Sequence, residues 1–581
     1  MAQHHVLSTI EILDEIFHHL QPAPKATSCY RPFFTWIDRE GLTALARAAR
    51  VCKVFYVPAC RVLWQQMINL EPLLALVPLP KKPRSCCKFT SLWHSRSRQP
   101  STNNSVSISR SPTSAWTLTG ACSIQIEART ASVCIDGAAW DRFRFYAAFV
   151  QVLVVKTSPW HVPPIKTLSK ELAMQQLFQL QGTIFPNLLF LTWTDELPAR
   201  ILSTRFLSPV MRGLCIACSG RHCSSLPPND CPWDSHIPAL LEQLATHSTA
   251  VLKLHLTTSH PCSHWLTLSV TLLPQNRQLS IRSLTLECYH DVTPSPKLQI
   301  PGLITLSQMP RLNSLTLMPD LVLISPREHD RIDFPHLREL RLYHRARTCP
   351  PTLEIIKSTS LRTLFLELNP WNQMAFQQAC SACVTAFPHL ENFTGLVASP
   401  QNCGEPTIYI THPGLAISEL CAPLFRLPDI RSMMICSFNL VQVTDADLVT
   451  FSQAWPKLRL LNILSQEDDS PSPVSVSYSG LLHFLDTLPD LVDLCLPRIE
   501  MTLENMRNIP PSTTHRTIQW LSAKGLAETH LRTLREELLP NLRVVPSLYA
   551  ERCGMFSVKT CPRDSDISPD LAHFLSSLAV V

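Results

Sequence analysis

A group of potential metal ligands lies in the segment "LCIACSGRHCSSLPPNDC", which contains Cys215, Cys218, His222, Cys223 and Cys231. Thiolate and imidazole groups are the usual ligands of structural zinc, and Cys215 and Cys218 have the C-x-x-C spacing of half a zinc knuckle. The other cysteines of the segment do not form a second closely spaced pair. The same residues also fit a degraded β-strand, in which cysteine is a small apolar residue. We therefore predict no metal site and no cofactor.

Chemistry that depends on glycine-rich loops is also missing from the sequence. The chain has 13 glycines, and the two closest, Gly213 and Gly220, are seven positions apart. A P-loop, a dinucleotide-binding loop and a hydrolase elbow need closer glycines, because only glycine takes positive φ without strain. An H-E-x-x-H motif is absent as well. We predict no catalytic residues and no enzymatic activity, and an enzyme with dispersed catalytic groups stays open as an alternative.

The composition is that of a chain rich in buried residues. Of the 581 residues, 45% are apolar and 17% are charged, and the 51 basic and 45 acidic residues leave a net charge of +6. This length requires several domains or one long repeat array. The first apolar stretch is interrupted by Glu11, Asp14 and Glu15, and no run approaches the ~18 apolar residues of a membrane span. We expect no membrane partner, a cytoplasmic and/or nuclear location, and reduced cysteines.

Three short helices are expected in residues 1–78. Ser8 and Glu11 have the spacing of a capping box, and apolar residues recur at helical spacing from Ile12 to Leu20. A second apolar stripe runs from Leu42 to Ala49. Pro58 suits the first turn of a third helix. Each helix is short, so the three must pack against one another.

The motifs "L-x-x-x-E-I-L-x-x-I-F", "L-x-x-L-A-R-A-A-R-V-C-K-x-F" and "V-L-W" follow one another between Leu7 and about Leu76. Their order resembles the F-box, and most closely the F-box proteins with C-terminal leucine-rich repeats that are abundant in mushroom-forming (basidiomycete) fungi. The resemblance implies docking onto the Skp-type linker protein of a cullin-RING ubiquitin ligase through apolar helix faces. The implied contact or contact-supporting residues are Leu7, Ile10, Ile12, Leu13, Ile16, Leu45, Val51, Cys52 and Val54.

The same segment departs from the F-box pattern at three places. Ile10 stands where many F-boxes have proline, Phe55 stands where they usually have tryptophan, and the loop of residues 21–37 is long. These departures favour an alternative function as a protein-interaction scaffold that does not bind a ligase.

Residues 79–125 are expected to form a basic, serine- and proline-rich linker. No acidic residue occurs between Glu71 and Glu127, whereas seven lysines and arginines do. A segment with so few apolar residues cannot offset the entropy lost on ordering. Because no aromatic residues alternate with the basic ones, we do not expect a nucleic-acid partner.

A repeated pattern of the form "aromatic or Leu, Pro, x, Leu, x, x, Leu, x, Leu" dominates residues 126–550. Examples are "FPNLLFLTW" from Phe185, "FPHLRELRL" from Phe334 and "WPKLRLLNI" from Trp455. The equivalent positions Ile281, Leu312, Leu337, Leu361 and Leu390 are 31, 25, 24 and 29 residues apart. The L-x-L piece predicts a short strand, and the proline ends the helix before it.

Units of this kind bury their leucines only against their neighbours, which gives a stacked solenoid. The pattern resembles irregular leucine-rich repeats. The predicted fold class is α/β, a leucine-rich-repeat solenoid with parallel strands on the concave face and helices on the convex face, preceded by the all-α F-box-like module. Residues 551–581 are expected to form a C-terminal tail or cap. Cys380 and Cys383 lie on an expected helix and are predicted to be core residues.

The residues between the buried leucines should point outward from the concave face, where an unidentified protein substrate would bind. Aromatic and charged residues at these positions are the best candidates for contacts, since aromatic residues dominate interface energetics. The candidates are Glu287, Met318, Glu339, Arg341, Tyr343, Phe365 and Glu367. The resulting hypothesis is a substrate-recognition adaptor of a Skp-cullin-F-box ubiquitin ligase.

Overall fold

The structure is a computed structural model of the 581-residue chain. It describes residues 10–19, 39–67, 70–74, 76, 137–156, 183–195, 204–218, 232–248, 250–258, 269, 272–273, 279–288, 297–318, 320–322, 331–344, 349–368, 373–397, 415–437, 441–465, 475–501, 517–524, 526 and 528–543. The expected linker at 79–125 and tail at 551–581 lie outside these ranges. Within the described ranges, no helix has the length and apolar character needed to cross a membrane.

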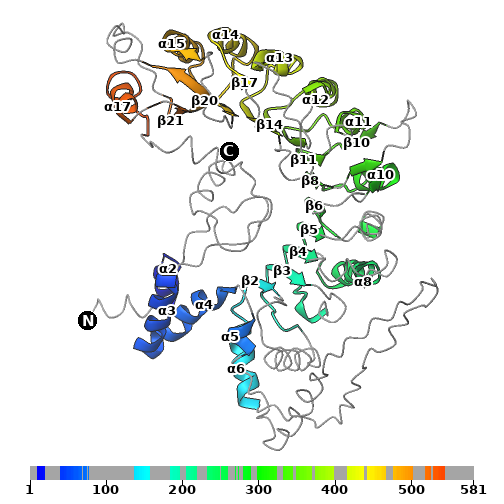
Figure 1. Ribbon diagram of the computed structural model, residues 1–581. Helices are drawn as coiled ribbons and strands as arrows, with labels where there is room; N and C mark the ends of the chain where they lie inside the picture. Colours follow the sequence, from blue (N-terminus) through cyan, green and yellow to red (C-terminus); the bar gives the residue numbers. More distant parts are fainter. Residues whose placement is uncertain are drawn as a thin grey trace, which may run out of the picture.

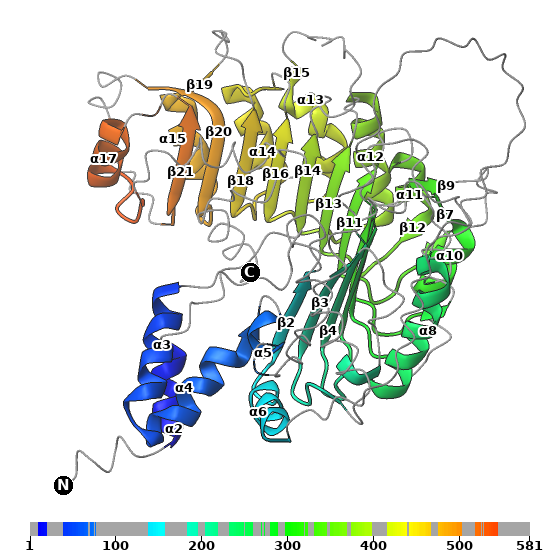
Figure 2. The same cartoon turned by 60° about the horizontal axis from the view of Figure 1, so that its bottom comes forward.

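Three helices form a small bundle at one end of the molecule (Figure 1). They are α2 (Ile10–His19), α3 (Arg39–Val51) and α4 (Lys53–Gln65). The third helix begins earlier than predicted, because the chain turns at Cys52 in an extended conformation and Pro58 lies inside α4. Two further helices lie between the bundle and the first strands (Figure 2): α5 (Glu71–Leu74) and α6 (Gly137–Ala147).

One continuous parallel sheet runs through the rest of the described chain. It has 15 strands, whose spatial order follows the sequence with small exceptions at the C-terminal end. The strands are β1 (Gln66–Met67), β2 (Val152–Lys156), β3 (Phe190–Asp195), β4 (Gly213–Cys218), β5 (Lys253–Thr258), β6 (Ser283–Cys288), β8 (Ser314–Leu317), β11 (Glu339–His344), β13 (Thr363–Leu368), β14 (Asn392–Val397), β16 (Ser432–Ser437), β18 (Leu460–Ser465), β20 (Asp493–Glu500), β19 (Val476–Ser477) and β21 (Trp520–Lys524).

The sheet curves, with strands on the inner side and helices on the outer side (Figures 1 and 2). The outer helices are α8 (Pro232–His247), α10 (Ile300–Ser307), α11 (Cys349–Ile355), α12 (Gln373–Ala386), α13 (Ile417–Cys421), α14 (Asp445–Ala454), α15 (Tyr478–Thr487) and α17 (Glu528–Glu537), with the 3-10 turns η3 (Thr204–Phe206) and η7 (Ala422–Arg426). Three two-stranded pairs complete the described part: β7 (Lys297–Gln299) with β9 (Asp320–Val322), β10 (Ile332–Asp333) with β12 (Ile356–Lys357), and β15 (Leu415–Ala416) with β17 (Val441–Gln442). The described chain is therefore a solenoid-like α/β fold.

Leucines aligned across neighbouring strands form the core. The register places Leu254, Leu284, Leu315, Leu340 and Leu364 side by side on β5, β6, β8, β11 and β13, and each is at most 1% exposed. A second row, with Leu256, Leu286, Leu317, Leu342 and Leu366, lies two residues further along the same strands. Full burial of one leucine side chain contributes about 1.5–3 kcal/mol. The regular leucine spacing in the sequence is thus the signature of these rows.

The prolines of the repeated pattern mostly follow a helix, as predicted. Helices α12, α14 and α15 end shortly before Pro388, Pro456 and Pro489. Pro335 is an exception, because the short strand β10 precedes it. Three of the proline carbonyls also link neighbouring units: Ser208 Oγ donates to Pro186 O (2.6 Å), Ser360 Oγ to Pro335 O (2.6 Å) and Thr517 Oγ1 to Pro489 O (2.5 Å).

Carboxylates join three successive outer helices. The Asp447 carboxylate closes a capping box with Thr444 at the start of α14 and also accepts from Ser418 N of α13 (3.3 Å). Asp445 in turn accepts from Ser477 N (2.8 Å) and Ser477 Oγ at the start of α15. These contacts satisfy helix N–H groups that have no partner within their own helix. The outer layer is therefore held in register by polar contacts as well as by packing.

The sequence-based prediction of an α/β fold with stacked parallel strands is confirmed. The strands expected from the segments at Phe185, Phe334 and Trp455, and from the equivalent positions Ile281, Leu312, Leu361 and Leu390, are all present. Strands β5 and β21 were not predicted. The segment "LPNLRVV" from Leu539 leaves the described residues after Arg543.

Gly395 of β14 offers a test of how tightly the core is packed. It occupies a position that aligns with Leu366 of β13, and a Cβ atom there would lie 2.9 Å from Cε2 of the buried Phe376 ring of α12. We expect Gly395→Ala to destabilise the protein by about 1–3 kcal/mol through overpacking. The free energy of unfolding from denaturant titration measures this effect.

A double-mutant cycle with Phe376→Leu identifies the cause. The leucine removes the ring atoms that face Gly395, so the alanine should cost less in this background. An unchanged cost would show that the ring contact is not responsible.

Candidate interaction surfaces

The helical bundle has its own small core. Leu13 and Phe17 of α2, Leu45 of α3, and Ala59 and Val62 of α4 form one buried cluster. The ring of Phe17 meets that of Phe55 edge-to-face, with centroids 5.8 Å apart. A side-chain hydrogen bond from Arg61 to Asp14 also joins α4 to α2.

Several apolar residues of the bundle remain outside this core. Ile12 and Ile16 lie one helical turn apart on α2 and are 38% and 43% exposed, while Val51 and Val54 flank the corner between α3 and α4 and are 70% and 47% exposed. Cys52 at the same corner is also exposed. Exposed apolar side chains at these positions are accessible to a protein partner.

The other residues predicted to contact the Skp-type linker protein have different positions. Leu13 and Leu45 are 2% and 0% exposed, so they support the bundle from within and cannot touch a partner directly. They face inward because a three-helix bundle needs one apolar stripe per helix for its own core. Ile10 is the first residue of α2, and Leu7 lies outside the described residues.

The bundle is joined directly to the sheet. The ring of Trp64 on α4 packs on Tyr146 of α6, with centroids 4.7 Å apart, and Tyr56 stacks on Phe145 at 6.3 Å. The strand β1 continues from α4 and pairs with β2. The residues that follow α4, namely Met67, Leu70, Leu73 and Leu74, belong to the main hydrophobic core. Residues within the predicted 1–78 module therefore form the first layer of the solenoid.

All seven predicted substrate contacts lie on or next to concave-face positions of adjacent strands. Glu339, Arg341 and Tyr343 alternate with buried leucines on β11, Phe365 and Glu367 alternate likewise on β13, Glu287 lies on β6, and Met318 follows β8. Met318, Glu339, Arg341, Phe365 and Glu367 are partly exposed.

Two of the seven do not point freely outward as expected. Glu287 is 2% exposed because it pairs with His255 of the neighbouring strand, and Tyr343 is 7% exposed because it packs against the Phe365 ring, with centroids 5.1 Å apart. Strands only ~4.8 Å apart bring such side chains into contact across the sheet.

Charged and polar side chains next to this aromatic pair are already organised. The Arg341 guanidinium binds Oε1 of Glu339, with both Nε and Nη2 at 2.6 Å, and Ser314 Oγ donates to Oε2 of the same carboxylate at 3.1 Å. The concave face of β8, β11 and β13 thus presents an aromatic ring beside a fixed ion pair, a combination common in protein-binding surfaces.

Further along the concave face, apolar side chains form a cluster of their own. It consists of Met434, Cys436, Leu464 and Cys495, with Leu396 packed against it. Sequence reasoning did not find this cluster. The available signal was the run "SMMIC", in which apolar residues occupy both sets of alternate positions of β16 instead of one.

A buried ion pair crosses β4, β5 and β6. His255 Nε2 lies 2.9 Å from Glu287 Oε2 and 2.7 Å from Thr257 Oγ1, and the two charged residues are 5% and 2% exposed. Burial alone would lower the pKa of His255, but hydrogen bonds to Cys215 and Glu287 outweigh it and raise the pKa to about 10. We interpret this group as an ion pair that ties three strands together.

Most of the described cysteines lie on strands of the sheet or on its outer helices, whereas Cys52 and Cys60 belong to the helical bundle. Cys215 and Cys218 lie on β4, as the degraded-strand interpretation predicts, although Cys215 faces His255 rather than the main core. His222, Cys223 and Cys231 lie outside the described residues. Among the described residues, no three His, Cys, Asp or Glu side chains are placed to hold a metal ion. Cys380 and Cys383 are fully buried on α12, as predicted, and burial raises the pKa of both thiols.

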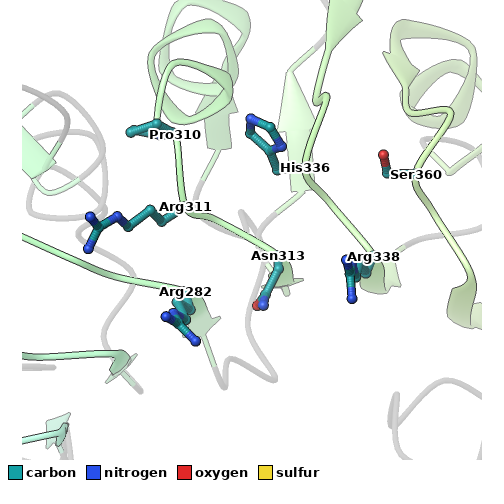
Figure 3. Close-up of a pocket in the computed structure, with 7 residues that line it drawn as sticks. All are labelled: Arg282, Pro310, Arg311, Asn313, His336, Arg338 and Ser360. Carbon is teal, nitrogen blue, oxygen red and sulfur yellow. The ribbon is translucent and has the colours of Figure 1, made fainter.

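An open basic groove lies at the edge of the sheet where the strands begin (Figure 3). It has a volume of about 580 Å³ and is lined by Arg282, Pro310, Arg311, Asn313, His336, Arg338 and Ser360. Arg282, Asn313 and Arg338 directly precede β6, β8 and β11. The groove was not predicted, because its residues belong to four different units of the chain.

Comparison with known proteins adds no relative to this picture. A scan against protein-family models found no match, and a search of curated proteins found none either. The assignment of a function therefore depends on the surfaces described above.

The His255–Glu287 pair predicts a specific pH dependence of stability. The pKa of His255 rises from 6.5 to about 10 on folding. Its contribution to the free energy of unfolding is therefore fully present below about pH 6.5 and is lost as the pH rises toward about 10, by up to about 1.4 kcal/mol per pH unit. Denaturant titrations across this window measure the slope.

Two variants separate this residue from other titrating groups. His255→Gln should destabilise the protein by about 3–5 kcal/mol at neutral pH, because the buried Glu287 carboxylate loses its cationic partner. It should also flatten the slope between pH 6.5 and 10. His255→Gln combined with Glu287→Gln should regain most of the stability. A slope identical to that of the unmodified protein would exclude the pair as its source.

Proposed function

We propose that this chain is the substrate-recognition adaptor of a Skp-cullin-F-box ubiquitin ligase. The bundle of α2, α3 and α4 serves as an F-box that binds a Skp-type linker protein. The solenoid is an irregular leucine-rich-repeat array whose concave face binds a protein substrate. In this function the chain carries out no chemistry. It raises the effective concentration of the substrate at the ligase.

The observation that carries the proposal is the set of exposed apolar side chains on the bundle. Ile12, Ile16, Val51 and Val54 are 38–70% exposed, although the bundle already has a core formed by other residues. These four residues match positions at which the F-box resemblance implies linker contacts. Their burial against a partner would contribute about 1–2 kcal/mol each.

The packing between the bundle and the sheet supports the same function. An adaptor has to hold its substrate at a fixed position relative to the ligase. The aromatic contacts of Trp64 with Tyr146 and of Tyr56 with Phe145, together with the pairing of β1 with β2, fix the bundle to the first layer of the sheet.

A second candidate is an interaction scaffold that binds no ligase. Phe55, which replaces the usual tryptophan of an F-box, is partly buried and packs on Phe17. Its ring therefore contributes to the bundle itself, and the linker-binding surface would have to do without it.

Binding to a purified Skp-type linker protein from a mushroom-forming fungus distinguishes the two candidates. For the full chain we expect a dissociation constant below about 10 μM, and Ile16→Asp with Val51→Asp should weaken binding at least about 30-fold, because each change removes about 1–2 kcal/mol of apolar burial. Isothermal titration calorimetry measures both values.

The matched control places the same charges elsewhere. Ile304 on α10 and Met374 on α12 are also exposed, at 41% and 61%, so Ile304→Asp with Met374→Asp should leave linker binding unchanged. Absence of binding by the unmodified chain, or equal weakening by both pairs of changes, would favour the scaffold.

The concave face is tested by proximity labelling with the full chain in cells that express it. We expect Arg341→Glu with Phe365→Ala to reduce the labelling of specific proteins by about tenfold, since a central aromatic and a charged contact are lost. The Ile304→Asp, Met374→Asp chain again serves as the control. Labelling that is unchanged by the concave-face variant would contradict a substrate site at β11 and β13.

A further inference from the structure

The basic groove at the start of the strands has a regular origin. Backbone hydrogen bonds connect Arg282 O to Asn313 N (2.8 Å), Asn313 O to Arg338 N (2.8 Å) and Arg338 O to Arg362 N (2.9 Å). The residues therefore form a row across β6, β8, β11 and β13. Because adjacent strands are ~4.8 Å apart, Arg282 and Arg338 begin about 10 Å from each other.

The two outer arginines of the groove are available to a ligand. Arg282 and Arg338 are exposed, and among the described residues neither side chain has an acidic partner. By contrast, Arg362 and Arg431 both lie near Glu391, with Nε–Oε distances of 3.4 and 3.8 Å. Arg311 donates to Ser280 Oγ (2.8 Å) and points away from the other two in Figure 3. The positive charge of the groove is thus concentrated at Arg282 and Arg338.

The Asn313 amide adds a hydrogen-bond donor in the row between the two arginines. His336 and Ser360 line the opposite wall (Figure 3), where the Ser360 hydroxyl already donates to Pro335 O (2.6 Å). None of the seven lining residues is acidic, and every fixed cation among them is arginine rather than lysine. The planar guanidinium binds two oxygens of one phosphate or carboxylate at once, which the lysine ammonium cannot do.

We propose that this groove binds a phosphorylated segment of a protein partner, with Arg282 and Arg338 as the phosphate ligands and Asn313 as an additional donor. Clusters of arginine are the usual means of recognising phosphorylated peptides. The groove contains no Phe, Tyr or Trp on which a base could stack, which favours a peptide over a single-stranded nucleic acid. This site lies outside the concave face and does not require ligase binding.

The test uses the full chain without a linker protein. An oriented peptide library with one fixed phosphoserine selects the preferred sequence, and fluorescence polarisation then compares that peptide with its unphosphorylated form. We expect the phosphate to strengthen binding at least about tenfold, as charge-assisted bidentate contacts do. Arg282→Ala with Arg338→Ala should abolish this difference. Arg338→Lys should reduce it, because the lysine keeps the charge but cannot bind two phosphate oxygens at once.

The matched control uses arginines of the same kind outside the groove. Arg212 and Arg459 directly precede β4 and β18 and are also exposed, so Arg212→Ala with Arg459→Ala removes the same charge. We expect this control to bind the phosphopeptide like the unmodified chain. Equal weakening by both pairs would show an effect of net charge and overturn the proposal. Equal binding of the unphosphorylated peptide would also overturn the proposal. The same holds if a single-stranded RNA of equal charge binds more tightly than the phosphopeptide and its binding depends on Arg282 and Arg338.

Discussion

The stacking of leucines between neighbouring strands is the interaction on which the rest of the structure depends. No single unit encloses a core, since its strand and helix are in contact mainly with the units before and after it. Rows such as Leu254, Leu284, Leu315, Leu340 and Leu364 exist only when the strands are in parallel register. This register also fixes the concave row of Arg341 and Phe365 and the basic row of Arg282 and Arg338. The positions of the functional surfaces therefore follow from the stacking of the leucines.

The solenoid-like α/β fold could be predicted from the sequence, because the residue spacing that produces it lies within each unit. The L-x-L spacing identifies the strands, and prolines such as Pro388 and Pro456 mark where helices end. The strand β5 was not predicted, although "KLHLTT" has the alternation of a strand. The start of α4 was misplaced: Pro58 is a strong local signal, but the extended conformation of Cys52 sets the helix start.

The candidate sites were less accessible from the sequence, because they depend on contacts between units. Alternation correctly placed Glu287 and Tyr343 on the concave strands, but nothing local showed that His255 and Phe365 would bury them. Likewise, the spacing of Leu13 and Ile16 on one helix does not show which of them faces the bundle core. The row of Arg282, Asn313 and Arg338 combines residues from three units, so only the strand register reveals it.

The two-residue strand β1 has a consequence for the first edge of the sheet. An open parallel sheet ends in unpaired N–H and C=O groups, which can recruit strands of other molecules and so promote aggregation. Here β1 covers part of the edge of β2 with only Gln66 and Met67, and the helical bundle begins directly before it. The bundle therefore acts as a terminal cap of the solenoid. Selection against aggregation would preserve this cap even in a descendant that no longer docked to any partner.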